Sequence, residues 1–109
     1  MMDQDDFSND CADTAAPIEG ALSRTFEIVN RKGLHARATA KFVQCAESFE
    51  AEIFVSRCGE TVGGSSIMGI LTLGAGIGST ITVSARGAQA VEALDGIGAL
   101  IANRFGEDE

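Results

Sequence analysis

The chain has 109 residues, 45% of them hydrophobic, and a formal net charge of −8. A chain of this length can bury one hydrophobic core but not two, so we expect a single folded domain. No segment approaches the roughly 20 apolar residues that cross a bilayer, and the N-terminus has acids where a signal peptide has basic residues, so we predict a cytoplasmic protein without membrane contact.

The first 21 residues have the composition of an acidic tail. Residues 1–20 contain six acids, no lysine or arginine, and the only proline, Pro17. Such a segment cannot bury enough apolar surface to offset its ordering entropy, so we expect residues 1–21 to be disordered. Residues 107–109 form an acidic C-terminal end with three more acids. The two ends together carry a charge of −9. The predicted domain at residues 22–106 therefore carries +1, which gives the overall −8.

The first part of the domain predicts a strand followed by a helix. Residues 24–29 alternate polar and apolar side chains, with Phe26 and Ile28 facing inward, as in a half-buried strand. A turn at residues 30–33 follows. From residue 36 to about residue 47, apolar positions recur at helical spacing. The members of this stripe are Thr39, Phe42, Val43 and Ala46.

The middle of the domain predicts a hairpin and a short helix. Residues 52–56 have the composition of a strand, and a turn containing glycine joins them to a short strand at residues 61–62. Ser65 or Ser66 can cap a short helix that ends near residue 73.

The last part of the domain predicts a strand at residues 80–85 and a helix at residues 88–103. Gly96 and Gly98 weaken this helix unless close packing requires them. The resulting order βαββαβα predicts an α+β fold of the open-faced β-sandwich type. In this fold three helices cover one face of a four-stranded antiparallel sheet.

The three cysteines, Cys11, Cys45 and Cys58, are widely spaced, form no CxxC pair and have a single histidine to join them. This odd set argues against a disulfide framework or a zinc site and predicts reduced thiols. We expect Cys45 and Cys58 to be small buried hydrophobic residues.

The segment Gly33-Leu34-His35-Ala36-Arg37-Ala38-Thr39 places the only histidine at a predicted helix start, beside an arginine. A helix start presents free backbone N–H groups and the positive end of the helix dipole, so it favours a bound anion. Neutral imidazole is a nucleophile near pH 7, because its unperturbed pKa is about 6.5. These residues predict that His35 carries a phosphoryl group, with Arg37 as a forked donor to it. The alternative is that His35 is a polar surface or capping residue.

Four cations surround His35 within eleven residues, with no acid among them: Arg31, Lys32, Arg37 and Lys41. Local positive charge attracts a phosphodonor and an acidic protein partner. The alternative is a solvated helix edge. Nucleic acid binding is disfavoured, because the chain has no Trp or Tyr for stacking and its acidic ends would repel a phosphate backbone.

The same segment resembles the active-site signature of the HPr phosphocarriers of the bacterial phosphoenolpyruvate-dependent phosphotransferase system, which is close to GLHARPA. The resemblance extends from about Leu22 to Arg104 and includes the spacing from His35 to Ser65-Ser66-Ile67-Met68-Gly69. Ala38 stands where most sugar-branch members have proline, so the sugar branch and the nitrogen-related branch both stay open.

The resemblance implies a carrier and not a stand-alone enzyme. It implies that enzyme I donates a phosphoryl group to Nδ1 of His35, which passes it to IIA-type acceptor proteins. It implies partner docking through Leu34 at the start of the first helix and through Ile67 and Met68 on the short helix. The alternative for Ile67 and Met68 is burial in the core. No metal or cofactor site is visible in the sequence, and we expect a monomer.

Ser66 has two possible roles. The resemblance implies that it is the regulatory serine phosphorylated by an HPr kinase/phosphorylase in organisms that have one. A phosphate there is tolerable at a helix start and adds negative charge to the docking face. The alternative is a simple helix cap.

Two further functions stay open at this point. The first is a regulatory binding module that passes on no phosphate and whose phosphorylation state selects its partners. The second is a hydrolase that uses His35, for which no Asp or Glu lies near enough in sequence to orient the histidine, although the fold could bring one in.

Overall fold

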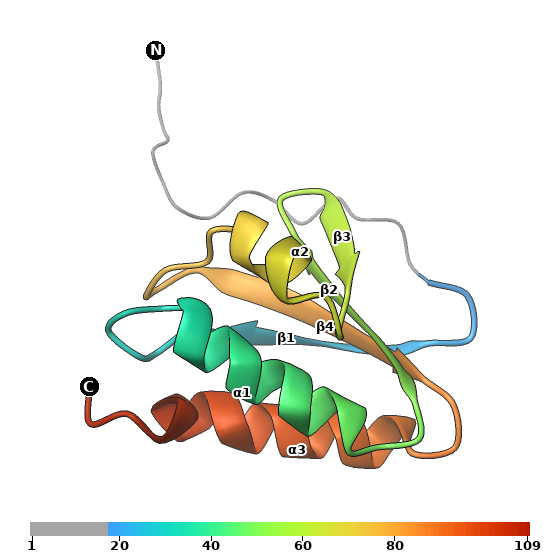
Figure 1. Ribbon diagram of the computed structural model, residues 1–109. Coiled ribbons are helices and arrows are strands. Elements are labelled where there is room, and N and C mark those ends of the chain that lie inside the picture. The colour runs from blue at the N-terminus through green and yellow to red at the C-terminus, as the bar shows by residue number, and fades with distance from the viewer. Residues whose placement is uncertain (1–17) are drawn as a thin grey trace.

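The computed structural model describes residues 18–109 (Figure 1). The elements follow in the order β1 (Leu22–Glu27), α1 (Ala36–Glu47), β2 (Glu52–Arg57), β3 (Glu60–Gly63), α2 (Ile67–Thr72), β4 (Thr80–Arg86), α3 (Ala90–Ala102) and the 3₁₀ turn η2 (Arg104–Gly106). The predicted order βαββαβα is confirmed. The expectation for residues 1–17 of the acidic tail lies outside the described residues.

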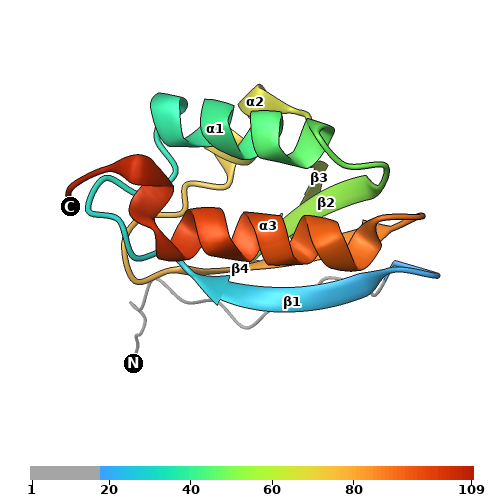
Figure 2. The same ribbon diagram turned by 90° about the horizontal axis from the view of Figure 1, so that it is seen from below.

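The four strands form one antiparallel sheet in the order β1-β4-β2-β3. Helices α1 and α3 lie side by side over one face of the sheet (Figure 2). The predicted open-faced sandwich is therefore correct. On the face of the sheet opposite α1 and α3, hydroxyl pairs join neighbouring strands, such as Ser23 with Ser84 at 2.8 Å and Ser56 with Thr61 at 2.8 Å.

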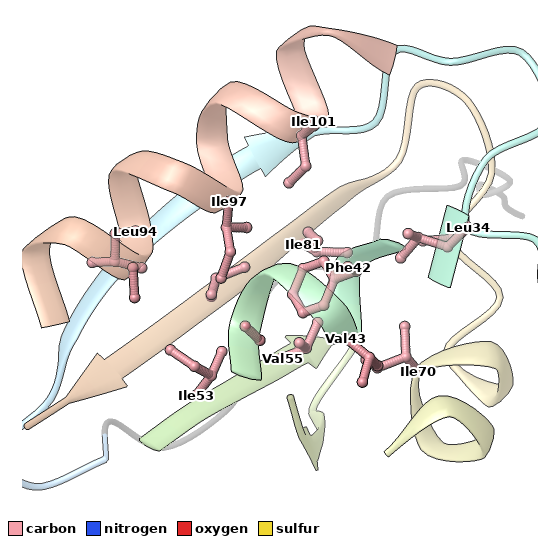
Figure 3. Close-up of a cluster of buried hydrophobic side chains, with 14 of the residues drawn as sticks. Leu34, Phe42, Val43, Ile53, Val55, Ile70, Ile81, Leu94, Ile97 and Ile101 are labelled. Atoms are coloured by element: carbon pink, nitrogen blue, oxygen red, sulfur yellow. The ribbon is translucent and has the colours of Figure 1, made fainter. Parts of the chain in front are cut away.

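The core lies between the sheet and the helices (Figure 3). Of the two inward positions predicted for the first strand, Ile28 is buried and Phe26 is partly buried against the core, and the predicted stripe of α1 is buried. The fully enclosed side chains include Phe42 of α1, Val55 of β2, Val83 of β4 and Ile97 of α3. Strand β1 pairs with residues 80–85 of β4 and spans residues 22–27, so both of its ends lie two residues before those of the predicted strand.

Close packing explains the glycines of α3. A Cβ atom on Gly96 would lie 2.7 Å from the ring of Phe49, and one on Gly98 would lie 2.8 Å from the ring of Phe26. The two aromatic rings occupy the space that side chains would need, so α3 can approach α1 and β1 closely. The helical propensity lost at these positions, about 1 kcal/mol each, is offset by burial of the rings.

The two cysteines in the described part of the chain differ. Cys45 is a free thiol that is partly buried against the core, and burial raises its pKa. Cys58 is exposed at the β2–β3 turn with a φ of 54°, and it is disulfide-bonded. The prediction of a buried, reduced thiol is wrong for Cys58, because the hairpin places this residue at its tip instead of on an inward strand position.

After α3 the chain bends toward the loop that precedes α1, through a turn that the sequence did not predict. Arg104, Phe105 and Gly106 have φ values of 58°, 55° and 79°, so three consecutive residues are left-handed. Phe105 is completely buried and Lys41 of α1 donates a hydrogen bond from Nζ to its carbonyl oxygen at 2.7 Å. In both views the C-terminal end lies beside the loop that precedes α1 (Figures 1 and 2).

Candidate active site at the start of helix α1

The loop before α1 is held by a buried asparagine and a glycine. Asn30 is fully buried and donates from Nδ2 to the carbonyl of Gly33 at 2.8 Å. Gly33 has a φ of +67°, and a Cβ there would lie 2.6 Å from the carbonyl oxygen of Ala75. The backbone N–H of Leu34 donates to that same oxygen at 2.9 Å. Only glycine permits this close approach, which fixes the backbone just before the histidine.

His35 is the N-cap of α1. Its backbone is extended, with φ −77° and ψ −179°, and its carbonyl accepts the N–H of Thr39 at 2.8 Å. The imidazole Nδ1 accepts the backbone N–H of Arg37 at 3.2 Å. A side chain that accepts from the first turn satisfies one of the free N–H groups of the helix. Capping by His35, which the sequence left open, is therefore observed, and it aims Nδ1 at the positive end of α1.

The other ring nitrogen of His35 contacts an acid from the end of the chain. Nε2 shares a hydrogen bond with Oε2 of Glu107, whose side chain is only 18% exposed. The second oxygen of this carboxylate, Oε1, accepts from Nδ2 of Asn30 at 3.1 Å. Glu107 is thus held by a hydrogen bond on each oxygen.

The electrostatics of the pair favour an ionised carboxylate. The hydrogen bond from His35 lowers the pKa of Glu107 below its ordinary value, aided by Asn30 and by the positive charge of Lys32, while desolvation opposes the shift. An ionised carboxylate only accepts hydrogen bonds, so the proton between the two side chains belongs to Nε2.

A cleft of about 540 Å³ opens over this pair. Its lining residues are Arg31, Lys32, His35, Ala36, Arg37, Glu107, Asp108 and Glu109. Arg31 forms an exposed ion pair with Glu109 at 2.7 Å. The guanidinium of Arg37 has no hydrogen-bond or ion-pair partner within residues 18–109, so it is available to a ligand in the cleft. Helix α1 has no acid in its first turn that would compete with an anionic ligand for this guanidinium.

The remaining predicted site residues lie on α2 and in the core. Ser66 is exposed and caps α2, because its Oγ accepts the N–H of Gly69 at 3.0 Å. Ile67 and Met68 are 42% and 71% exposed.

Leu34 is only 6% exposed and belongs to the core cluster, so its side chain offers little surface to a partner. Of the cations predicted around His35, Lys41 turns away to the carbonyl of Phe105.

Sequence reasoning missed Glu107 and Asn30. The available signal was the charge complementarity between the three acids at the C-terminal end and the cations around His35. Position in the chain gave no indication that the two groups meet, because the turn at residues 104–106 has no recognisable sequence pattern apart from Gly106.

Residues 18–109 contain no group of three or more His, Cys, Asp and Glu side chains able to hold a metal ion. Within the same residues, no helix has both the length and the apolar character needed to cross a membrane.

Comparison with known proteins identifies relatives of this chain. Residues 22–103 match the family model described as PTS HPr component phosphorylation site. The chain is 51% identical over 88 residues to the phosphocarrier protein HPr of Cupriavidus necator, a match that covers 81% of this chain and 99% of that protein. It is 41% identical over 86 residues to the phosphocarrier protein NPr of Shewanella violacea, covering 79% and 94% of the two chains.

Solved structures agree with these matches. The crystal structure of HPr-C-His from Thermoanaerobacter tengcongensis has a TM-score of 0.77 and 41% identity, covering 81% of this chain and 99% of that one. A phosphocarrier protein HPr from Bacillus anthracis has a TM-score of 0.73 and 40% identity, covering 76% and 99%. The architecture and the sequence therefore point to the same group of proteins.

Proposed function

The chain belongs to the HPr family, the phosphocarrier component of the phosphotransferase system and not a stand-alone enzyme, and we propose that His35 is the residue that carries its phosphoryl group. In this proposal phospho-enzyme I is the donor and histidines of IIA-type proteins are the acceptors. The observation that carries the assignment is the position of His35, the only histidine of the chain, as N-cap of α1 with Nδ1 at the helix start.

Nδ1 is the ring nitrogen suited to the chemistry. It accepts a hydrogen bond, so its lone pair is not blocked by a proton. In the transfer, this lone pair forms a bond to the phosphorus of the donor, and the donor's bond to phosphorus breaks with its electron pair returning to the donor. Transfer to an acceptor histidine repeats these steps with His35 as the leaving group. The protein contributes position and charge, which is most of what phosphoryl transfer requires.

Charge around Nδ1 supports a bound phosphoryl group. The backbone N–H of Arg37, which Nδ1 accepts in the unphosphorylated protein, is free to donate to a phosphoryl oxygen once Nδ1 is modified. The guanidinium of Arg37 lies in the same cleft and can donate two parallel hydrogen bonds to two such oxygens. We assign Arg37 the stabilisation of the charge on the transferring group.

The same proposal gives α2 a docking and regulatory role. Ile67 and Met68 are exposed and adjacent, and α2 packs beside α1, so a partner that reaches the start of α1 can contact them. Methionine suits a surface that serves several partners because it is flexible and polarisable. A phosphate on the exposed hydroxyl of Ser66, added by an HPr kinase, would place about two negative charges next to this surface and hinder an approaching partner.

The experiment that tests the relay measures transfer from this protein to a second one. The protein is phosphorylated with enzyme I and phosphoenolpyruvate, separated from both, and mixed with a purified IIA-type protein. We expect the label to move to the IIA protein and to leave His35. If the label stays on this chain while the two proteins still bind each other, the protein is a regulatory module whose phosphorylation selects partners, and the relay is wrong.

A further inference from the structure

We propose that Glu107 is a positioning residue for phosphoryl transfer, which holds a proton on Nε2 of His35 and compensates the positive charge that the imidazole gains when Nδ1 is phosphorylated. This inference rests on the proposed function of His35 and adds to it a role for the C-terminal end of the chain. It is carried by the hydrogen bonds that converge on the imidazole from two parts of the sequence.

The two ring nitrogens of His35 face opposite chemical partners. Nδ1 faces a backbone N–H, which can only donate, and Nε2 faces a carboxylate, which can only accept when ionised. Both contacts require the same tautomer of the neutral ring, with the proton on Nε2 and the lone pair on Nδ1. The partners of both ring nitrogens therefore favour the tautomer in which Nδ1 is the nucleophile.

The carboxylate is itself oriented. Asn30 is fully buried and donates from one amide group to Oε1 of Glu107 and to the carbonyl of Gly33, so the loop before His35 and the carboxylate share one anchor. Hydrogen bonds therefore run from Asn30 through Glu107 to His35. A histidine whose second nitrogen donates to a fixed carboxylate has its ring orientation and proton position set by that partner.

An unfavourable turn brings Glu107 to this place. Three consecutive left-handed residues bend the chain after α3, and two of them, Arg104 and Phe105, have side chains that disfavour this conformation. The turn is stabilised by complete burial of Phe105 and by the hydrogen bond from Lys41 to its carbonyl. Without the turn, the chain would continue away from the cleft along the axis of α3.

The contact has a direct consequence for the reaction. When Nδ1 forms its bond to phosphorus, the ring retains its proton on Nε2 and becomes a cation, which the adjacent carboxylate stabilises. When the phosphoryl group leaves, the electron pair returns to Nδ1 and the ring is again the neutral Nε2–H tautomer. No proton has to move in either direction, because it stays between Nε2 and Glu107.

The first arm of the test is spectroscopic and needs no enzyme. Because the chain has one histidine, its imidazole nitrogen and N–H resonances belong to His35 without ambiguity. At about pH 9, well above the ordinary imidazole pKa of about 6.5, wild type should show a downfield Nε2–H proton protected from solvent exchange. Glu107→Gln should keep this proton at a less downfield position, since an amide oxygen still accepts, and Glu107→Ala should lose its protection.

The second arm measures the rate of phosphorylation by enzyme I and phosphoenolpyruvate. Glu107→Ala and Glu107→Gln should each slow it about tenfold, the low end for a charge-assisted hydrogen bond at a partly exposed site. Glu92→Gln is the control, because it makes the same change at an exposed residue in the first turn of α3, outside the cleft, and its rate should change by about twofold or less.

The outcomes separate this inference from the proposed function. If wild type itself is not phosphorylated, the proposed function fails, while the resonances still report the contact. If wild type is phosphorylated and Glu107→Ala retains both the protected Nε2–H and the wild-type rate, the positioning role is wrong. Faster phosphorylation of Glu107→Ala would make the carboxylate an obstacle, and equal slowing by Glu92→Gln would reduce its effect to general charge. Either result overturns the inference.

Discussion

The carboxylate of Glu107 and the imidazole of His35 are 72 positions apart in the sequence and share a hydrogen bond in the folded protein. The histidine lies at the start of the first helix, and the acid lies just beyond the turn that ends the last one. The site is therefore complete only when α3 and η2 have packed against α1. Folding of the C-terminal end and assembly of the site are coupled through this contact.

Replacing Arg37 with alanine should slow phosphoryl transfer without affecting the fold. The side chain is exposed and has no partner within the described residues, so its removal opens no cavity. The loss of a forked donor to the phosphoryl group should lower the rate about tenfold or more. The measurement is the initial rate of phosphorylation by enzyme I, together with the melting temperature.

Two control variants make the Arg37 test specific. Arg37→Lys keeps the charge without the fork and should recover only part of the rate. Arg24→Ala removes a cation that pairs with Asp95 outside the cleft, and it should leave the rate unchanged. Equal rates for Arg37→Ala and wild type in both directions of transfer would remove Arg37 from the site.

Replacing Gly33 with alanine should destabilise the protein and displace His35. The new Cβ would meet the backbone at Ala75 and Gly76, at 2.6 Å and 2.7 Å, and it would sit at a φ of +67°. We expect a loss of about 2 kcal/mol or more in the free energy of unfolding, from strain and overpacking together. Urea denaturation measures this loss.

Gly74→Ala is the matched control for Gly33. Gly74 has almost the same φ, +66°, but a Cβ added there would have no neighbouring atom within 4 Å. The Gly74→Ala variant should lose only the free energy needed to hold a residue with a Cβ at positive φ, about 1 kcal/mol. If both variants lose the same stability, the close approach of Gly33 to the loop at residues 75–76 has no energetic role.

The contribution of Glu107 to stability should depend on pH. Because the hydrogen bond from His35 lowers its pKa in the folded state, the contribution is full above the ordinary Glu pKa of 4.5 and is lost as the pH falls through the lowered value. Wild type should exceed Glu107→Gln by about 1 kcal/mol in unfolding free energy near neutral pH. The difference should shrink toward zero in acid.

Glu109→Gln provides the comparison for this pH series. Its ion pair with Arg31 is exposed on both sides, so its loss should change stability little at any pH. A difference between wild type and Glu107→Gln that stays constant from neutral pH into acid would mean that the ionised carboxylate does not stabilise the fold.

Replacing Ser66 with aspartate should slow phosphorylation of His35 at low salt. The added charge lies at the start of α2, next to the exposed Ile67 and Met68, where it should repel an acidic or phosphorylated partner. The effect should decrease with salt, since exposed charges are screened over about 10 Å at 0.1 M. Stability should change little, because an acid is favourable at a helix start.

Ser66→Ala separates charge from capping. It removes the acceptor of the Gly69 N–H and should cost about 1 kcal/mol of stability while leaving the phosphorylation rate near that of wild type. If Ser66→Asp and wild type are phosphorylated equally fast at low salt, Ser66 is only a cap. A large fall in melting temperature for Ser66→Asp would mean that the substitution unfolds α2.

The sequence pattern alone predicted the bounds of elements that depend on neighbouring residues. Helix α1 spans residues 36–47 as predicted, because its apolar stripe and the turn before it are both encoded in neighbouring residues. Both ends of β1 lie two residues before the predicted ones, because strand bounds depend on pairing with β4, which lies far along the chain.

Long-range packing determines what the sequence could not reveal. Residues 33–39 predicted His35 and Arg37 at a helix start, and both are there. Glu107 depends on a turn in which Arg104 and Phe105 adopt a conformation that their residue types do not favour. Complete burial of Phe105 in the core stabilises that turn, and no local period or motif encodes it.

The central claim is that His35 carries the phosphoryl group, and a mass measurement tests it most directly. The protein is incubated with enzyme I and phosphoenolpyruvate, and its mass is compared before and after exposure to acid and to base. We predict a gain of one phosphate that is labile in acid and stable in base, and no gain for His35→Ala. Labelling of His35→Ala to the wild-type extent would contradict the account.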